Sequence, residues 1–166
     1  SIVVKSTVLP GTTDTLIKNI LEKESSKKLG EFGLGMNPEF LREGNAIYDF
    51  LNADRIIIGW EDEKTKIRLE NLYKPWTCEK ITVNTRTAEF IKYTNNCFLA
   101  LQVSTTNEIA NLAYEVGGVD IQEIMSGLYL DHRWNPKVEG KRINPKILKY
   151  LKAGCGFGGS CFPKDL

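Results

Sequence analysis

The sequence predicts an α/β fold followed by an all-α part: the second half of a Rossmann-like doubly wound sheet, then a long-helix dimerisation domain. Short apolar, β-branched runs alternate with helical periods in the first half, which is the order of a doubly wound sheet. Later the period stays helical, and one helix is long enough to link two domains or form a dimer interface. We therefore expect one domain at residues 1–84 and another at residues 85–166.

The α/β half opens with a strand, a loop and a helix. Residues 1–4 predict a buried parallel strand that ends at Lys5-Ser6-Thr7. After Pro10-Gly11, Thr12 or Thr13 can cap a helix with a solvated, charged end at residues 22–28. The inner face of this helix is expected at Leu16, Ile17, Ile20 and Leu21.

Three further strands and one helix complete this half. A weak strand over residues 32–36 ends at Asn37-Pro38, where a loop begins. Residues 56–60 predict the third strand and residues 81–83 the last one. Between these two strands, residues 63–73 repeat at the helical period, so a helix joins them.

A helix over residues 87–116 dominates the second half, with about 30 residues and a length of roughly 45 Å. Gly117-Gly118 ends it, and Asp120 can cap a second helix that follows. The remaining segments are an irregular polar stretch at residues 133–140 and a short helix at residues 146–151.

Composition and charge exclude several classes of protein. The chain has 166 residues, 42% of them hydrophobic, and a net charge of +1 with its 22 basic residues scattered, so we expect no nucleic-acid partner. No apolar run reaches the length of a membrane span and no signal peptide opens the chain, so we expect a cytoplasmic protein with no membrane partner. Four cysteines without C-x-x-C spacing and one histidine predict free thiols and no metal site.

Both ends of the sequence are unusual. Residues 1–4 predict a strand that is already under way, and the chain stops at Asp165-Leu166, directly after a motif. We therefore expect an internal piece of a longer protein.

A glycine-rich loop with a thiol lies near the end of the chain, Gly154-Cys155-Gly156-Phe157-Gly158-Gly159-Ser160-Cys161-Phe162-Pro163-Lys164-Asp165. Its glycines let the backbone approach a bound molecule. A nearby cation favours the thiolate, and a carboxylate can take or orient a proton, so Cys161 with Lys164 and Asp165 is a candidate nucleophile. The alternative is a glycine turn with a buried cysteine. Cys97 and Cys155 are interpreted as packing cysteines.

Two polar pairs have the four-residue spacing of one helix face. Lys92 and Asn96 supply the donors that hold an alkoxide or oxyanion, although a snorkelling Lys beside a surface Asn has the same spacing. Glu39 and Glu43 are carboxylates whose alternative role is a favourable charge at a helix N-terminus. Thr7 follows a strand, where α/β sheets bind ligands.

Four ordered blocks of the sequence resemble the UDP-glucose/GDP-mannose 6-dehydrogenase family over nearly the whole chain. The cysteine loop carries GFGGSCFPKD, and the other blocks are Lys5-Ser6-Thr7-Val8 with Pro10-Gly11-Thr12-Thr13, residues 37–44, and residues 88–96. The glycines at 154–159 lack a flanking strand and helix, so we reject them as the dinucleotide fingerprint. The pyrophosphate-binding turn is therefore expected outside this sequence.

The resemblance implies an NAD-dependent enzyme that oxidises the 6-hydroxymethyl group of a nucleotide sugar, as in UDP-glucose to UDP-glucuronate. Cys161 would carry the thiohemiacetal and thioester. Lys92, Asn96 and Asp165 would serve the alcohol and the oxyanion. Glu39 and Thr7 would place the hydrolytic water. GDP-mannose or a UDP-N-acetylhexosamine is the alternative substrate, and a catalytically silent dimerisation module is the alternative for this piece, which we expect to be inactive.

The resemblance also implies binding roles and a homodimer formed through the long helix. The cofactor-binding residues would be Thr7, Glu43 and Lys164. The substrate-binding residues would be Phe40, Leu41, Lys92, Asn96, Arg133, Lys152, Phe157 and Gly158. Arg133 would reach the substrate of the other subunit, with Arg142 as its competitor for that role.

Overall fold

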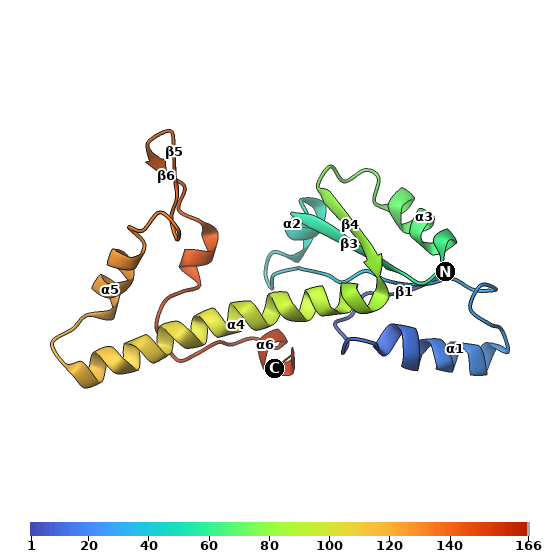
Figure 1. Cartoon of the computed structure of the whole chain (residues 1–166), viewed down its shortest axis with the longest axis horizontal. Helices are drawn as coiled ribbons and strands as arrows, with labels where there is room; N and C mark the ends of the chain where they lie inside the picture. The colour runs from blue at the N-terminus through green and yellow to red at the C-terminus, as the bar shows by residue number, and fades with distance from the viewer. Residues whose placement is uncertain (166) are drawn as a thin grey trace. The chain divides into compact units, whose positions relative to one another are not determined.

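The structure is a computed structural model that describes residues 1–165, and these form two compact units, residues 1–95 and residues 96–165. Figure 1 shows the helices and strands of the chain. The division falls inside one continuous helix, α4 (Thr85–Val116), because a regular helix carries no break where the surrounding contacts change. The domain boundary expected between residues 84 and 85 stays a prediction.

The first unit is built on a mixed four-stranded sheet with strands β1 (Ile2–Val4), β2 (Leu34–Met36), β3 (Arg55–Trp60) and β4 (Glu79–Asn84) in that order. β1 and β2 are parallel, β3 and β4 are parallel, and the central pair β2–β3 is antiparallel. Helices η1 (Thr12–Ile17) and α1 (Lys18–Ser25) connect the first pair, and α3 (Glu63–Leu72) connects the second (Figure 1). The sheet therefore consists of two βαβ units, as expected for the second half of a Rossmann-like fold.

Alternate residues of β3 pack on opposite faces of the sheet. Ile56 and Ile58 join Leu69 of α3 in one apolar cluster, whereas Ile57 packs with Ala88 of α4 in another. A strand that is covered on both faces requires a continuous apolar run, which is why Ile56-Ile57-Ile58 has no alternation.

Asp62 links α3 to the sheet. Its carboxylate accepts the Thr65 N–H at 2.9 Å, which caps α3, and the Leu34 N–H at 2.9 Å, at the residue where β2 begins. Burial raises the pKa of Asp62, but the hydrogen bonds from Leu34 and Thr65 outweigh it, so the pKa lies below its usual value. The hydrogen bonds of the folded protein therefore stabilise the ionised carboxylate of Asp62.

Gly59 of β3 lies against the first turns of α4, with no room for a side chain. A Cβ at this position would lie 2.7 Å from Ala88 Cβ and 3.0 Å from the Met36 carbonyl oxygen. We expect Gly59→Val to lower the free energy of unfolding by about 1–3 kcal/mol or more through overpacking. Gly127→Ala, which meets no atom within 4 Å, is the control and should be neutral or stabilising. Equal midpoints of denaturant unfolding for Gly59→Val and wild type would contradict this prediction.

Several expectations for the first unit are wrong. Neither Thr12 nor Thr13 caps η1, because Gly11 is the N-cap at φ 92° and the side chain that caps it comes from α4. Leu16 and Ile20 are 58% and 50% exposed, so they are not an inner face. β1 is an edge strand with Ile2 42% exposed, because a single neighbouring strand covers it. Helix α2 (Ala46–Leu51) was expected to be loop.

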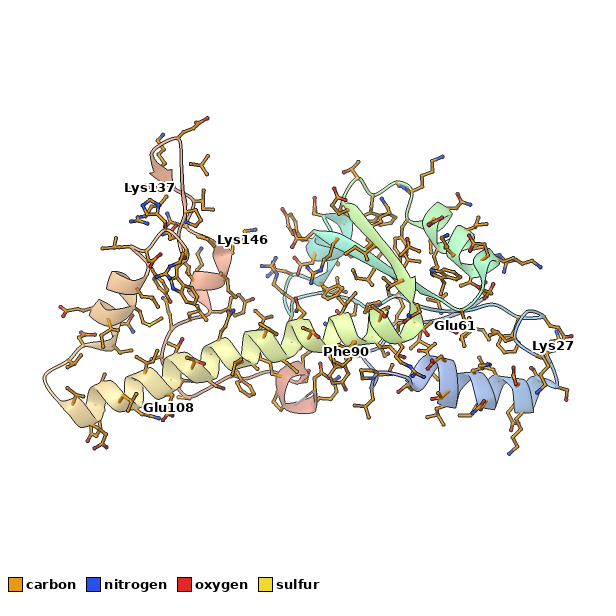
Figure 2. The ribbon with its side chains drawn as sticks, viewed as in Figure 1. Lys27, Glu61, Phe90, Glu108, Lys137 and Lys146 are labelled. Carbon is orange, nitrogen blue, oxygen red and sulfur yellow. The ribbon has the colours of Figure 1, made fainter. Side chains whose placement is uncertain are left out.

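The second unit follows α4 with α5 (Ile121–Leu128), the hairpin β5 (Lys137–Val138) and β6 (Lys141–Arg142), η2 (Lys146–Lys149) and α6 (Cys161–Asp165). Asp120 caps α5, as predicted, by accepting the Gln122 N–H at 2.6 Å. The hairpin, where Figure 2 labels Lys137, was expected to be irregular. Glu139 and Gly140 have φ values of 50° and 77°, as a two-residue primed turn requires.

The described helices lack the combination of length and apolar composition that a membrane span requires.

Candidate active site

A buried asparagine fixes the start of the loop after β2. Asn37 is 3% exposed, and its amide donates to the Ile57 carbonyl at 2.7 Å. Its Oδ1 accepts hydrogen bonds from Tyr73 Oη and Lys5 Nζ, both at 2.5 Å. The loop that carries Glu39 therefore leaves the sheet in one direction, because a buried amide that is bonded at both its nitrogen and its oxygen has no equivalent alternative orientation. The sequence did not indicate the contributions of Lys5 and Tyr73.

Helix α2 anchors the other end of this loop. Asp49 accepts hydrogen bonds from the Arg42 N–H at 2.9 Å and from its guanidinium at 3.0 and 2.6 Å. Glu43 follows Arg42 and is exposed. The 37–45 loop is thus held at both ends, and Glu39, Phe40 and Leu41 lie between the two anchors.

Lys92 and Glu39 meet between these anchors. Glu39 Oε1 lies 3.4 Å from Lys92 Nζ, and Glu39 Oε2 accepts the Leu41 N–H at 2.8 Å. Lys92 is 5% exposed, so the alternative of a snorkelling lysine is wrong. A buried ammonium requires a carboxylate partner, which Glu39 provides from a loop more than fifty residues earlier.

Phe40 lies next to two cations. Lys92 Nζ is 5.2 Å and Arg55 Cζ is 4.0 Å from the centroid of its ring. Arg55 also donates to Asn95 Oδ1 at 2.9 Å. Cation–π contacts of this kind fix the ring beside Lys92. Arg55 was missed, because a basic residue at a strand end has no distinguishing signal in one sequence.

Thr7 is half-buried in the loop after β1. Its neighbour Val8 packs in the same apolar cluster as Phe40, the neighbour of Glu39. Since β1 and β2 are parallel, their carboxyl ends lie at one edge of the sheet, which brings the Thr7 and Glu39 loops to the same edge.

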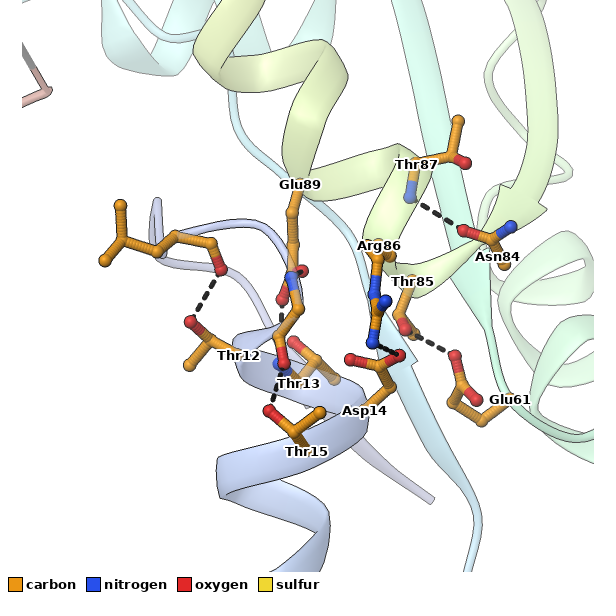
Figure 3. A network of polar contacts seen from close by, with 12 residues as sticks. Thr12, Thr13, Asp14, Thr15, Glu61, Asn84, Thr85, Arg86, Thr87 and Glu89 are labelled. Carbon is orange, nitrogen blue, oxygen red and sulfur yellow. Dashed lines mark hydrogen bonds and ion pairs between the residues drawn. The ribbon is translucent and has the colours of Figure 1, made fainter.

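A buried carboxylate from α4 holds the start of η1. Glu89 is 0% exposed and accepts the Gly11 N–H at 2.5 Å and the Thr13 N–H at 2.8 Å (Figure 3). Beside it, Arg86 Nη2 lies 2.7 Å from Asp14 Oδ2 (Figure 3). Sequence reasoning did not select Glu89, although it precedes Lys92 by one helical turn and so shares its face.

Asp165 bonds two other polar side chains in the second unit, those of Asn96 and Lys164. It is 7% exposed, and its Oδ2 accepts from the Asn96 side-chain amide at 2.6 Å. Its Oδ1 forms an ion pair with the Lys164 ammonium. Asn96, at 5% exposed, is not the surface asparagine of the alternative interpretation. The structure thus joins three of the predicted residues, Asn96, Lys164 and Asp165.

The Cys161 thiol is free and exposed at the first residue of α6. The alternative of a buried structural cysteine is therefore wrong for Cys161, and Cys155 is also exposed rather than packed. Phe157 packs edge-to-face on Phe162 with centroids 5.7 Å apart, while Gly158 is exposed. The loop thus presents a thiol four residues before a buried carboxylate.

The two candidate arginines differ in their environment. Arg142 donates to the backbone carbonyls of Asn135 at 2.8 Å and Leu130 at 2.7 Å, so its guanidinium holds the base of the hairpin. The side chain of Arg133 is 87% exposed and pairs with Asp131 at 2.6 Å. The guanidinium and N–H of Arg133 lower the pKa of Asp131 to about 2. Lys152 is exposed.

The fold and these groups define a class of protein, a Rossmann-like α/β half joined to a helical half that carries an exposed thiol. Residues 1–77 match the NAD binding domain of the UDP-glucose/GDP-mannose dehydrogenase family, and residues 86–166 match its central domain. The chain belongs to the UDP-glucose/GDP-mannose dehydrogenase family, and its cofactor is NAD.

The particular relatives are mostly UDP-glucose 6-dehydrogenases. The UDP-glucose 6-dehydrogenase YwqF of Bacillus subtilis is 44% identical, over 99% of this chain and 34% of its own length. A UDP-glucose dehydrogenase structure from Pyrobaculum islandicum superposes with a TM-score of 0.83 at 42% identity, covering 98% of this chain and 34% of that one. The GDP-mannose dehydrogenase of Pseudomonas aeruginosa superposes with a TM-score of 0.72 at 42% identity, covering 98% and 35%. The chain thus spans about a third of the length of these relatives.

Two of the residues expected to bind NAD, Thr7 and Glu43, lie in the loops that follow β1 and β2. The Thr7 hydroxyl and the Glu43 carboxylate follow two parallel strands whose carboxyl ends share one edge, and both groups can bond a ribose or carboxamide. The glycine segment at 154–159 follows no strand, which agrees with its rejection as the pyrophosphate turn. The residues present would therefore hold only part of the cofactor.

Proposed function

We propose that the full-length protein that contains this chain is a cytoplasmic UDP-glucose 6-dehydrogenase that converts UDP-glucose to UDP-glucuronate. The observation that carries the proposal is the buried Lys92 ammonium, paired with Glu39 and fixed beside Phe40. The exposed thiol of Cys161 and the buried Asn96–Asp165 pair supply the remaining groups of the chemistry. The resemblance in sequence to enzymes with this name supports the choice of substrate.

The first oxidation converts the 6-hydroxymethyl group to an aldehyde. Lys92 and the Asn96 amide stabilise the alkoxide as the hydroxyl proton leaves, and Asp165 orients the Asn96 amide and accepts the proton through a water molecule. NAD, when bound, accepts a hydride in each of the two oxidations.

The second oxidation passes through Cys161. The thiolate adds to the aldehyde carbon and forms a thiohemiacetal, whose oxygen Lys92 and Asn96 stabilise. Loss of hydride from that carbon leaves a thioester. Water placed by Glu39 and Thr7 then adds to the thioester carbonyl, the C–S bond breaks, the thiol recovers its proton, and the uronate leaves.

A panel of nucleotide sugars tests the proposal. We expect the full-length protein to reduce two NAD per UDP-glucose oxidised, with this chain alone producing no NADH. GDP-mannose is the second candidate, because a structure of that specificity superposes on 98% of the chain. NADH formation with GDP-mannose or a UDP-N-acetylhexosamine instead of UDP-glucose would reassign the substrate. If no sugar gave NADH, the alternative of a catalytically silent dimerisation module would remain.

We further propose a homodimer formed through α4. Phe98 and Leu101 are each 61% exposed and Leu112 is 59% exposed along this helix, and Phe90, nearer its start, is exposed as well (Figure 2). An apolar side of this extent on a 32-residue helix requires a partner. We expect a dimer at micromolar concentration by light scattering, and Leu101→Glu should weaken it. A monomeric wild-type chain would contradict the proposal.

Within this dimer, we propose that Arg133 binds the nucleotide sugar of the other subunit, because its side chain is 87% exposed, whereas Arg142 is bonded to backbone carbonyls at the base of the hairpin. Arg133→Ala in the full-length protein should raise KM for the sugar. Mixing Arg133→Ala with Cys161→Ser subunits should restore activity, since the site with an intact Cys161 would receive its arginine from the other chain. Mixtures that stay inactive would show that Arg133 does not reach the active site of the other subunit.

A further inference from the structure

Glu89 is a buried charged group that the mechanism above leaves without a role. It is fully buried on α4, and its two carboxylate oxygens are bonded separately to the Gly11 and Thr13 N–H groups, at 2.5 and 2.8 Å (Figure 3). These N–H groups belong to the first turn of η1 and lack partners within the helix. Burying a carboxylate is costly unless such donors compensate it, so the contact has a specific geometry.

This contact joins the Thr7 loop to α4. Thr7 lies four residues before Gly11, whose N–H is bonded to Glu89. Val8 packs in the cluster that contains Ala88 and Ile91, the neighbours of Glu89 and Lys92. The segment from Val8 to Thr13 is therefore held in two ways, by the apolar cluster at Val8 and by the Glu89 carboxylate of α4 at Gly11 and Thr13.

Glu89 also occupies the N-terminus of η1. Free N–H groups at the start of a helix form a site for anions such as phosphate, and here a side chain of the protein fills it. The N-terminus of η1 is therefore used to bind the Thr7 loop to Glu89 of α4.

We propose that Glu89 is a positioning residue that fixes the Thr7 loop relative to Lys92, one helical turn further along α4, and so orients the water that hydrolyses the thioester. The inference rests on the proposed function. Glu89 acts through the backbone of the loop, and it contacts no reacting atom.

Glu89→Gln in the full-length protein tests the inference. Glutamine has the shape of glutamate, but its NH₂ group faces one of the two N–H donors, so one hydrogen bond is replaced by a repulsion. Misplacement of this kind costs up to about 10²-fold in rate. We expect stopped-flow measurements with UDP-glucose to show a burst of about two NADH per active subunit at nearly wild-type rate, followed by slower turnover in which hydrolysis limits.

Arg86→Gln is the matched control. It removes the adjacent ion pair between α4 and η1, whose arginine side chain is 59% exposed, but leaves the Glu89 contact intact. Its ratio of burst rate to turnover should equal that of the wild type. If Glu89→Gln does not fold, Glu89→Asp replaces it, because aspartate keeps the charge but is too short to bond both N–H groups.

Each outcome bears on a separate claim. In Glu89→Gln, the burst amplitude and the turnover rate could fall in the same proportion while the ratio of burst rate to turnover rate stays that of the wild type. This result would mean that Glu89 only stabilises the fold, and it would overturn the inference. An unchanged variant would overturn it too. A wild-type protein that is inactive with every nucleotide sugar would instead refute the proposed function.

Discussion

Glu39→Gln should trap a uronyl group on Cys161 in the full-length protein. The substitution retains an oxygen for the Leu41 N–H, which Glu39 accepts at 2.8 Å, but removes the base that activates water. Loss of a general base typically lowers a rate by about 10²–10⁴. Hydrolysis should therefore limit turnover, and intact-mass spectrometry after addition of UDP-glucose and NAD should show the added mass.

Two cysteine variants in the Glu39→Gln background locate the adduct. Cys161→Ser should abolish the added mass, whereas Cys155→Ser, which changes the other exposed thiol of the same loop, should leave it. Peptide mapping assigns the modified residue. An unmodified Glu39→Gln protein with normal turnover would show that Glu39 is not the base, and an adduct on Cys155 would refute the choice of nucleophile.

Lys92→Met should lower kcat by about 10²–10³, the effect of removing one donor from an oxyanion site. Methionine fills a similar space in the buried site beside Phe40 but removes the ammonium that lies 3.4 Å from Glu39. We expect the loss in kcat to exceed any change in KM, since the donor stabilises charge that develops during the reaction.

Lys64→Met, at an exposed lysine of α3, is the control for general effects of losing a charge. It should retain wild-type kcat and thermal midpoint. A Lys92→Met enzyme with kcat within threefold of wild type would show that Lys92 only stabilises the loop after β2. A folded Lys92→Met protein with undetectable turnover agrees with the prediction.

Local patterns were sufficient for most of the elements. The apolar run at 56–58, the helical period from 87 to 116 and the Asp120 cap all depend on residues within a few positions of one another, and each was predicted correctly. The short turn at Glu139-Gly140 was missed, because two-residue strands carry too few side chains for an alternating pattern.

Contacts between segments that are distant in the chain could not be predicted from local sequence patterns. Gly11 and Glu89 are 78 residues apart, so no local rule predicts that a carboxylate of α4 caps η1 in place of Thr12 or Thr13. The antiparallel direction of β3 against β2 depends likewise on the path of the 37–54 connection through α2.

The sequence by itself determined the family, the cofactor and the chemical identity of the candidate groups, because thiol, ammonium and carboxylate occur in ordered motifs. Only the tertiary structure decided which of these groups are buried and paired: Lys92 with Glu39, Asn96 with Asp165, and Glu89 with the loop after β1. The physical reason is that a charge in the interior requires a partner with compensating charge or hydrogen bonds, and the partner is selected by the fold of the whole chain rather than by spacing along it.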